Sequence, residues 1–298
     1  MDAPSAVRKY SEPEYAKPDQ QKTNSPYWRA KIDKYLIPET QRLLDEYSNI
    51  PLEKQSYHVH KIRDQAWAIR SYPCTGLGMW LDPFLPHSPS YQTILQRLRD
   101  GARLIEIGCF LGNDLCRLAF DGAPTDNMYG VDIVNHWDVS FAMYRDRGRF
   151  KAQFIQANLL SNLDESPALK ELQGTVDIIY VSAVLHQWDW KGQVEAAKRV
   201  AAFTRAPSRE GCKAMIVGYQ VEMLRQRKWS MKRHRYPCGG ILQRPLQSSG
   251  EQVGAETGTT WKTESRLRSY EEMGWDPADF AWLEPGDMAL DFVVTRIR

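Results

Sequence analysis

The sequence predicts an α/β fold in which helices alternate with the strands of a mostly parallel sheet. Three observations predict it. Residues 103–120 combine an apolar strand, a glycine-containing turn and a helix, and strand-like and helical segments then alternate as far as residue 220. Near the end, strands are predicted at 280–283 and 288–297, and two adjacent strands joined by so short a turn run antiparallel.

The first part of the chain predicts helices and no strand. Residues 1–26 are polar and contain several prolines, so we expect an extended arm. A Ser-Pro pair ending at Pro26 predicts the start of a helix that runs to about Leu36. We therefore expect residues 27–100 to form a helical cap that helps to bind substrate, and residues 101–298 to form the main sheet domain.

The first predicted strand contains Glu106 and leads into a turn framed by Gly108 and Gly112, where a backbone can approach a ligand closely. The carboxyl edge of an open α/β sheet is where nucleotide-like ligands bind. The spacing differs from the G-x-G-x-x-G pattern that seats a pyrophosphate, which an adjacent acid would also repel. An acid would attract the ammonium group of S-adenosylmethionine (SAM), which has no phosphate. The alternative is an ordinary strand–helix turn whose glycines serve packing.

The next two predicted strands carry candidate adenosine contacts. The strand at 128–133 contains Asp132, at the position where doubly wound sheets place the carboxylate that binds both ribose hydroxyls. That position serves NAD as well as SAM. Ile133 is expected on one face of the adenine. After a third strand at 152–157, Asn158 is expected to accept a hydrogen bond from the adenine amino group, with an Asx turn as the alternative.

His186 follows a fourth predicted strand at 176–182, which is almost continuously apolar, as a central parallel strand should be. That position lies over the expected cleft, so His186 is a candidate reaction-site residue, although an isolated histidine is more often structural. Residues 221–260, after the fifth strand, are too long for an ordinary connection. We predict a lid over the substrate there, or alternatively a dimer contact. A helix is predicted at 261–273.

Arg63, Trp67 and Arg70 fall on one face of a predicted helix. Two guanidinium groups beside an indole are suited to clamp a carboxylate and cover an aromatic ring, which makes these residues candidates for substrate binding. The competing interpretation, which the sequence favours, is a solvated basic face with Trp67 packed in the core.

Bulk composition limits the function classes. The 298 residues are 42% hydrophobic and 26% charged, and a formal net charge of +2 with no basic block argues against a nucleic-acid partner. The five scattered cysteines include no C-x-x-C pair. They argue against a disulfide framework or a metal site and favour the cytoplasm as location. No apolar run is long enough to span a membrane.

Several segments together carry a family resemblance. They are Glu106-Ile-Gly-Cys-Phe-Leu-Gly-Asn-Asp-Leu115, Phe120-Asp-Gly-Ala-Pro124, Tyr129-Gly-Val-Asp-Ile133, Leu185-His-Gln-Trp-Asp-Trp190 and Thr257-Gly-Thr-Thr-Trp261. From about Arg63 to the C-terminus, the chain resembles fungal methyltransferases of secondary-metabolite clusters. It is most similar to the meroterpenoid group that methyl-esterifies the carboxylate of farnesylated dimethylorsellinic-acid intermediates.

The resemblance implies a class I methyltransferase fold, a Rossmann-like seven-stranded sheet whose last strand is antiparallel, with SAM as cofactor. It also implies the roles of the site residues. Glu106, Gly108 and Gly112 would surround the methionine half of SAM, Asp132 would hold the ribose, and Ile133, Asn158 and Leu159 would contact the adenine. An Asp is more usual than Asn at position 158 in class I enzymes. The implied substrate is a small aromatic or terpenoid acid, and a homodimer is possible.

The chemistry distinguishes the candidate substrates. A carboxylate is already anionic at neutral pH and needs no general base, so His186, Arg63 and Arg70 would serve only to orient it. A phenol, with a pKa of about 10, would benefit from a base, for which His186 is the candidate. The competing hypotheses are therefore a phenol O-methyltransferase, an NAD-dependent oxidoreductase, and a non-catalytic SAM-binding regulator.

Overall fold

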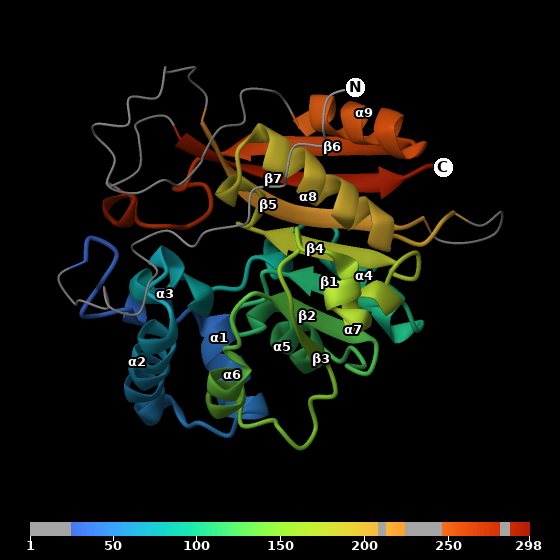
Figure 1. Ribbon diagram of the computed structural model, residues 1–298. Coiled ribbons are helices and arrows are strands. Elements are labelled where there is room, and N and C mark those ends of the chain that lie inside the picture. Colours follow the sequence, from blue (N-terminus) through green and yellow to red (C-terminus); the bar gives the residue numbers. More distant parts are fainter. Residues whose placement is uncertain (1–24, 208–212, 224–245, 281–286) are drawn as a thin grey trace.

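The computed structural model describes residues 25–207, 213–223, 246–280 and 287–298. Within them, seven strands form one sheet in the order β3-β2-β1-β4-β5-β7-β6 (Figure 1). The strands are β1 Leu104–Ile107, β2 Met128–Asp132, β3 Gln153–Gln156, β4 Ile178–Ser182, β5 Met215–Met223, β6 Trp261–Arg268 and β7 Asp287–Arg296. Strands β1 to β5 are parallel, whereas β7 runs antiparallel to both β5 and β6. This order confirms the class I methyltransferase fold.

Helices pack on both faces of the sheet. They are α1 Pro38–Arg42, α2 Leu52–Ile69, α3 Pro73–Leu77, α4 Tyr91–Arg99, α5 Asn113–Phe120, α6 Trp137–Tyr144, α7 Pro167–Glu171, α8 Trp190–Phe203 and α9 Leu246–Thr257. Side chains of α2, α4, α5 and α6 share one buried core with β1, β2 and β4. Side chains of α7 and α8 share the core on the opposite face. The N-terminal helices therefore belong to the same packed body as the sheet.

Successive side chains of β1 point to opposite faces of the sheet and so enter different cores. Ile105 and Ile107 enter the core with α7 and α8, while Leu104 lies in the core with α4 and α5. Glu106 shares the parity of Leu104 and is only 5% exposed. A carboxyl group is thus buried inside the sheet, beside the first turn.

Two predicted helices are absent or shortened, one in the N-terminal region and one near the C-terminus. The helix expected from Pro26 to Leu36 is reduced to a single 3-10 turn, Asp33–Tyr35, because this segment pairs with other parts of the chain instead. One such contact is the hydrogen bond from the Arg29 N–H to the Gly76 carbonyl. The helix expected at 261–273 is strand β6 over most of its length. Its mixed polar sequence favours no regular structure strongly, and pairing along β7 decides the outcome.

The predicted antiparallel pair at the end of the sheet exists, but its residues differ. Strand β7 matches the prediction at 288–297, whereas its antiparallel partners are β5 and β6. Phe280, the predicted start of another strand, follows a 3-10 turn, and residues 281–283 lie outside the described part of the chain.

The predicted insertion at 221–260 is only partly described. Residues 221–223 complete β5, and α9 packs against α8 through Val253, Val194 and Ala201. Helix α9 therefore covers the sheet rather than the substrate, which corrects the lid prediction for that part; residues 224–245 lie outside the described residues.

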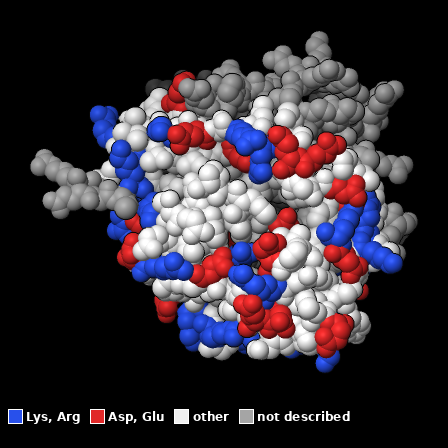
Figure 2. Space-filling model, turned by 180° about the vertical axis from the view of Figure 1, so that it is seen from behind, with Lys and Arg blue, Asp and Glu red and all other residues white. Residues whose placement is uncertain are grey.

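The surface shown in Figure 2 carries lysine, arginine, aspartate and glutamate side chains interspersed with one another, around an uncharged central area. Among the described residues, no helix combines the length and apolar character needed to cross a bilayer.

Candidate functional site

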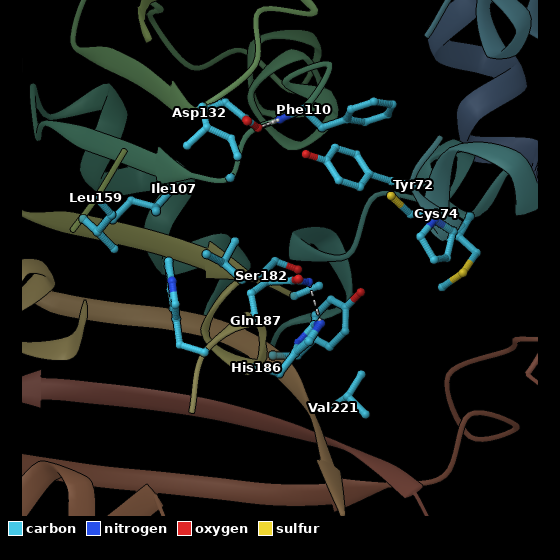
Figure 3. Close-up of a pocket in the computed structure, with 18 of the residues that line it drawn as sticks. Tyr72, Cys74, Ile107, Phe110, Asp132, Leu159, Ser182, His186, Gln187 and Val221 are labelled. Carbon is cyan, nitrogen blue, oxygen red and sulfur yellow. Dashed lines mark hydrogen bonds between the residues drawn. The ribbon is translucent and has the colours of Figure 1, made fainter. Parts of the chain in front are cut away.

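A cavity of about 270 Å³ lies at the carboxyl ends of the parallel strands. Figure 3 shows Asp132 and Phe110 on one side of it, His186 and Val221 on another, and Tyr72 reaching in from the segment between α2 and α3. This is the edge of the sheet where the sequence predicted a ligand. Both the sheet domain and the N-terminal region contribute to the cavity.

Asp132, at the end of β2, holds the glycine turn in place. Its Oδ2 accepts a hydrogen bond from the Phe110 N–H at 2.9 Å, and its Oδ1 accepts one from the Val134 N–H at 3.0 Å. Each carboxylate oxygen has lone pairs for a further donor, so the group is suited to accept the two ribose hydroxyls. The structure places Asp132 in the cavity lining, as predicted.

Ile133, Asn158 and Leu159 line the same cavity. The Asn158 Oδ1 accepts a hydrogen bond from the Leu160 N–H at 2.9 Å, which is an Asx turn. The two interpretations of Asn158 are therefore compatible, because the residue shapes the turn after β3 and also faces the cavity. Together with Gly108 and Asp132, these three residues form what we call the donor edge, named after the methyl donor SAM that the sequence predicts there.

Gly108 has a left-handed backbone with φ of +73°, and a Cβ there would lie 2.2 Å from the Cγ2 atom of Val184, another lining residue. Glycine is thus required both by conformation and by space. Gly112 is also left-handed, with φ of +62°, but it is the N-cap that precedes α5 and does not line the cavity.

Phe110, between these two glycines, was not predicted as a site residue. Its φ is +48°, which is uncommon for a residue with a Cβ, and it lines the cavity. Ala183, directly after β4, has a φ of +53° and also lines the cavity. Left-handed non-glycine residues of this kind cost about 1–3 kcal/mol each and cluster at functional sites. The signal in the sequence was a bulky residue at the centre of a glycine turn.

Glu106 lies behind the cavity wall and is not among the residues that line it. Burial, and the nearby carboxylates of Asp114 and Asp132, raise the pKa of Glu106 well above its ordinary value. Its Oε2 atom is buried and has no hydrogen-bond partner among the described residues. The structure therefore places Glu106 behind the cavity lining, in surroundings that favour its protonated form.

His186 lines the cavity after β4, as predicted, within the short 3-10 turn Leu185–Gln187. Its Nε2 lies 3.1 Å from the Gln187 Nε2, so the amide donates to an unprotonated ring nitrogen. Burial lowers the pKa of His186 to about 4. The imidazole is therefore neutral at physiological pH and is a weak base.

The other predicted substrate residues, Arg63, Trp67 and Arg70, do not line the cavity. The Arg63 guanidinium is buried over the Trp28 ring, 3.8 Å from its centroid, and Trp67 packs with Tyr27. The structure thus contradicts the prediction that Arg63 and Trp67 clamp a substrate. It also contradicts a solvated position for Arg63, whereas Trp67 is packed in the core, as the competing interpretation predicted. These side chains hold the N-terminal segment against α2.

Arg70 ends α2 in an extended backbone conformation. Together with burial, its charge lowers the pKa of His136 to about 4, which places the guanidinium near the start of α6. The helical spacing that put Arg63, Trp67 and Arg70 on one face therefore ends before Arg70.

Four aromatic side chains form the other side of the cavity: Tyr219, Tyr270, Trp275 and Phe280. We call them the aromatic wall. The ring planes of Tyr270, Trp275 and Phe280 lie within 12–16° of one another, with centroids 4.6–5.8 Å apart. Sequence reasoning missed Tyr270 and Phe280 because it assigned 261–273 to a helix and 280–283 to a strand. The high aromatic content was the one available signal.

The cavity is mostly apolar. Among the described residues that line it, Asp132 is the only carboxylate, and no lysine or arginine is present. The described residues also contain no group of three or more His, Cys, Asp or Glu side chains arranged to hold a metal ion. The apolar lining is suited to a reaction that depends on the positioning of its reactants in a dry site.

Comparison with known proteins agrees with this arrangement. Residues 27–81 match the family model described as the meroterpenoid methyltransferase N-terminal domain. The chain is 34% identical over 288 residues to the O-methyltransferase atr3 of Stereocaulon alpinum, an alignment that covers 94% of this chain and 79% of that protein.

Two further relatives match over shorter stretches. The chain is 30% identical to the O-methyltransferase phiE of a fungal species, over 80% of this chain and 79% of that protein. It is 37% identical to the asnovolin E/chermesin D methyltransferase nvfJ of Aspergillus novofumigatus, over 57% of this chain and 60% of that protein. With the strand order and the glycine turn described above, these likenesses establish that the chain belongs to the fungal secondary-metabolite O-methyltransferases, which are SAM-dependent enzymes.

Proposed function

We propose that this enzyme methyl-esterifies the carboxylate of a meroterpenoid acid, a prenylated aromatic-derived intermediate. The match of residues 27–81 to the meroterpenoid methyltransferase model and the likeness to a methyltransferase of asnovolin E and chermesin D support the substrate class. The aromatic wall, opposite the donor edge, offers a large apolar surface to such a molecule. In the same proposal, the donor edge holds SAM.

The burial of His186, which lowers its pKa to about 4, together with an otherwise apolar cavity lining, supports the choice of a carboxylate. A phenol loses its proton at a pKa of about 10 and gains from a base in the site. Within the described cavity lining, no other side chain is a better base, because Asp132 is committed to the glycine turn. An acceptor that arrives already ionised needs none.

The residues around the cavity fit SAM. Asp132 offers two acceptors for the ribose, Ile133 and Leu159 are apolar contacts for the adenine, and Gly108 leaves space where any Cβ would collide. When bound, SAM supplies a methyl group on a sulfonium. The chain aligns the acceptor oxygen with that methyl group and excludes water, so that opposite charges meet in an apolar site.

Incubation with methyl-labelled SAM and an extract of a producing fungus tests the proposal. The expected product carries its label in a methyl ester, which mild alkali hydrolyses to labelled methanol. A label that resists hydrolysis would mark an aryl ether and favour the phenol alternative, whereas no labelled product would favour a non-catalytic SAM-binding regulator. The same incubation with Asp132→Ala protein is the control.

The NAD-dependent alternative no longer stands, because the antiparallel β7 and the family both belong to methyltransferases. We also propose that the enzyme acts in the cytoplasm, which the scattered, odd number of cysteines supports. A homodimer stays a prediction, and light scattering of the purified protein tests it.

A further inference from the structure

One buried carboxylate ties the N-terminal region to the loop that carries the aromatic wall. Asp279 is 1% exposed and ends the 3-10 turn Pro277–Asp279. The Arg29 Nε donates to its Oδ1 at 2.8 Å, while the Tyr35 hydroxyl and the Lys34 Nζ both reach its Oδ2 at 2.6 Å. These three partners lie almost 250 residues away in sequence.

Charge explains why this contact is strong. Hydrogen bonds in which one partner is ionised are roughly twice as strong as neutral ones, and burial of the carboxylate limits screening by water. The two cations and the phenol hold the pKa of Asp279 below its usual range, in spite of the burial that raises it. The carboxylate therefore keeps its charge at physiological pH, and all three partners remain bound.

The turn that Asp279 closes lies inside the aromatic wall. Trp275 precedes it and Phe280 follows it directly. The Trp275 and Phe280 rings lie 5.3 Å apart with an interplanar angle of 13°, and both face the cavity. A shift of the turn would move both rings together, because Phe280 directly follows Asp279, and only Asp276 separates Trp275 from the start of the turn.

We infer that Asp279 is a positioning residue through which residues 29–35 fix the aromatic wall, so that the N-terminal region decides which acceptor ring system the cavity accepts. This inference rests on the proposed function, in which the aromatic wall holds the acceptor. It predicts that weakening the contact at Asp279 impairs acceptor binding and leaves cofactor binding intact.

The same turn offers a matched control. Asp276 also pairs with Lys34, at 2.7 Å, but its side chain is 44% exposed, against 1% for Asp279. Ion pairs between exposed side chains contribute little to stability. Asp276→Asn keeps an oxygen for the hydrogen bond from the Ala278 N–H, so it removes a charge from the turn without opening it.

The first test needs no acceptor. The full-length protein is labelled with 5-fluorotryptophan and saturated with S-adenosylhomocysteine, and the Trp275 fluorine resonance is assigned with Trp275→Phe. Asp279→Asn should shift or broaden that resonance while the Kd for S-adenosylhomocysteine stays within about twofold. Asp276→Asn, next to Trp275 in the chain, should change the resonance less than Asp279→Asn does and leave the Kd unchanged. An unchanged Trp275 resonance in Asp279→Asn overturns the inference, whatever the natural substrate is.

The second test separates positioning from general stability. With the acceptor purified from the extract experiment, Asp279→Asn should raise the acceptor KM about tenfold and change kcat by less than about threefold. A fall in kcat of about tenfold with no change in the acceptor KM would contradict a positioning role. If Asp279→Asn does not fold, Tyr35→Phe removes only one of the three hydrogen bonds, and the same two measurements on it decide the question.

Discussion

The two sides of the cavity are built in different ways. The donor edge comes from short stretches in which a strand runs directly into a turn, as where β2 ends in Asp132 and Ile133. The aromatic wall joins Tyr219 on β5 to Trp275 and Phe280 near the C-terminus, and Asp279 anchors it to the N-terminal region. Local geometry fixes the first side, whereas long-range contacts fix the second.

This difference suits the two molecules that the enzyme is proposed to bind. The donor side has to hold the same adenosine compound in every relative, and backbone turns with one carboxylate do so with little dependence on distant residues. The acceptor side has to differ among enzymes with different substrates. A wall of side chains on a loop changes more easily than a strand–turn–helix unit.

The largest effect is expected at the donor edge. Asp132→Ala removes the acceptor for two ribose hydroxyls and also the partner of the Phe110 and Val134 N–H groups. Charged hydrogen bonds contribute about 1.5–3 kcal/mol each, so the Kd for S-adenosylhomocysteine should rise roughly 100-fold or more in calorimetry. The exposed Asp126→Asn is the control. Wild-type affinity in Asp132→Ala would mean that the cofactor binds elsewhere.

A smaller effect is expected at the aromatic wall, and it should change acceptor binding but not cofactor binding. Trp275→Leu keeps an apolar side chain but removes the stacking with Tyr270 and Phe280, which contributes about 0.5–1.5 kcal/mol per pair. The acceptor KM should rise about tenfold, while the Kd for S-adenosylhomocysteine should not change. Trp190→Leu on α8, outside the cavity, should leave both unchanged. Loss of cofactor affinity in Trp275→Leu would show that the two sides are not separable.

Glu106 provides a test by pH. Its pKa is raised in the folded protein by burial and by Asp114 and Asp132, so the folded state keeps a proton that the unfolded state releases above pH of about 4.3. The stability that this proton contributes is complete below that pH and is lost as the pH rises toward the pKa of Glu106 in the folded protein. Glu106→Gln removes this loss, so its melting temperature should gain on wild type between pH 5 and pH 8, by about 2–4 °C for each kcal/mol of stability that wild type loses.

Calorimetric melting curves of both proteins, with the exposed Glu53→Gln as control, measure this difference. A constant gap between wild type and Glu106→Gln across the pH range would mean that Glu106 is ionised in the folded state. In that case its carboxylate would again be a candidate partner for the ammonium group of SAM.

The smallest effect is expected at His186. Because burial lowers its pKa to about 4 and a carboxylate needs no base, His186→Gln should reduce kcat by only about threefold. The rate of ester formation with the purified acceptor measures it. A loss of about three orders of magnitude, in the range that general-base catalysis contributes, would instead support a phenol substrate.

Sequence reasoning succeeded where the signal was local. The alternation of apolar strands with helices predicted β1 to β5, and the position of the acids at the strand ends predicted Asp132 in the cavity. It failed where a segment had two possible partners. The residues of β6 favour no regular structure strongly, and its hydrogen bonds to β7 make it a strand.

The candidate site shows the same division. Arg63 and Trp67 have the right spacing for a ligand clamp, but spacing says only that they share a helix face, not what that face meets. The face meets Trp28 and Tyr27, so the two side chains are buried in packing. Trp275 and Phe280 have no distinguishing pattern in the sequence, yet they line the cavity.

The sequence by itself determined the sheet up to β5, the glycine turn and the acid at the end of β2, because each depends on residues close together in the chain. Only the tertiary structure decided that Glu106 is buried with a raised pKa, that burial lowers the pKa of His186, and that Asp279 joins the N-terminal region to the turn before Phe280. Burial and the neighbours of a charged group are set by packing between distant segments, and a pKa or an ion pair follows from them.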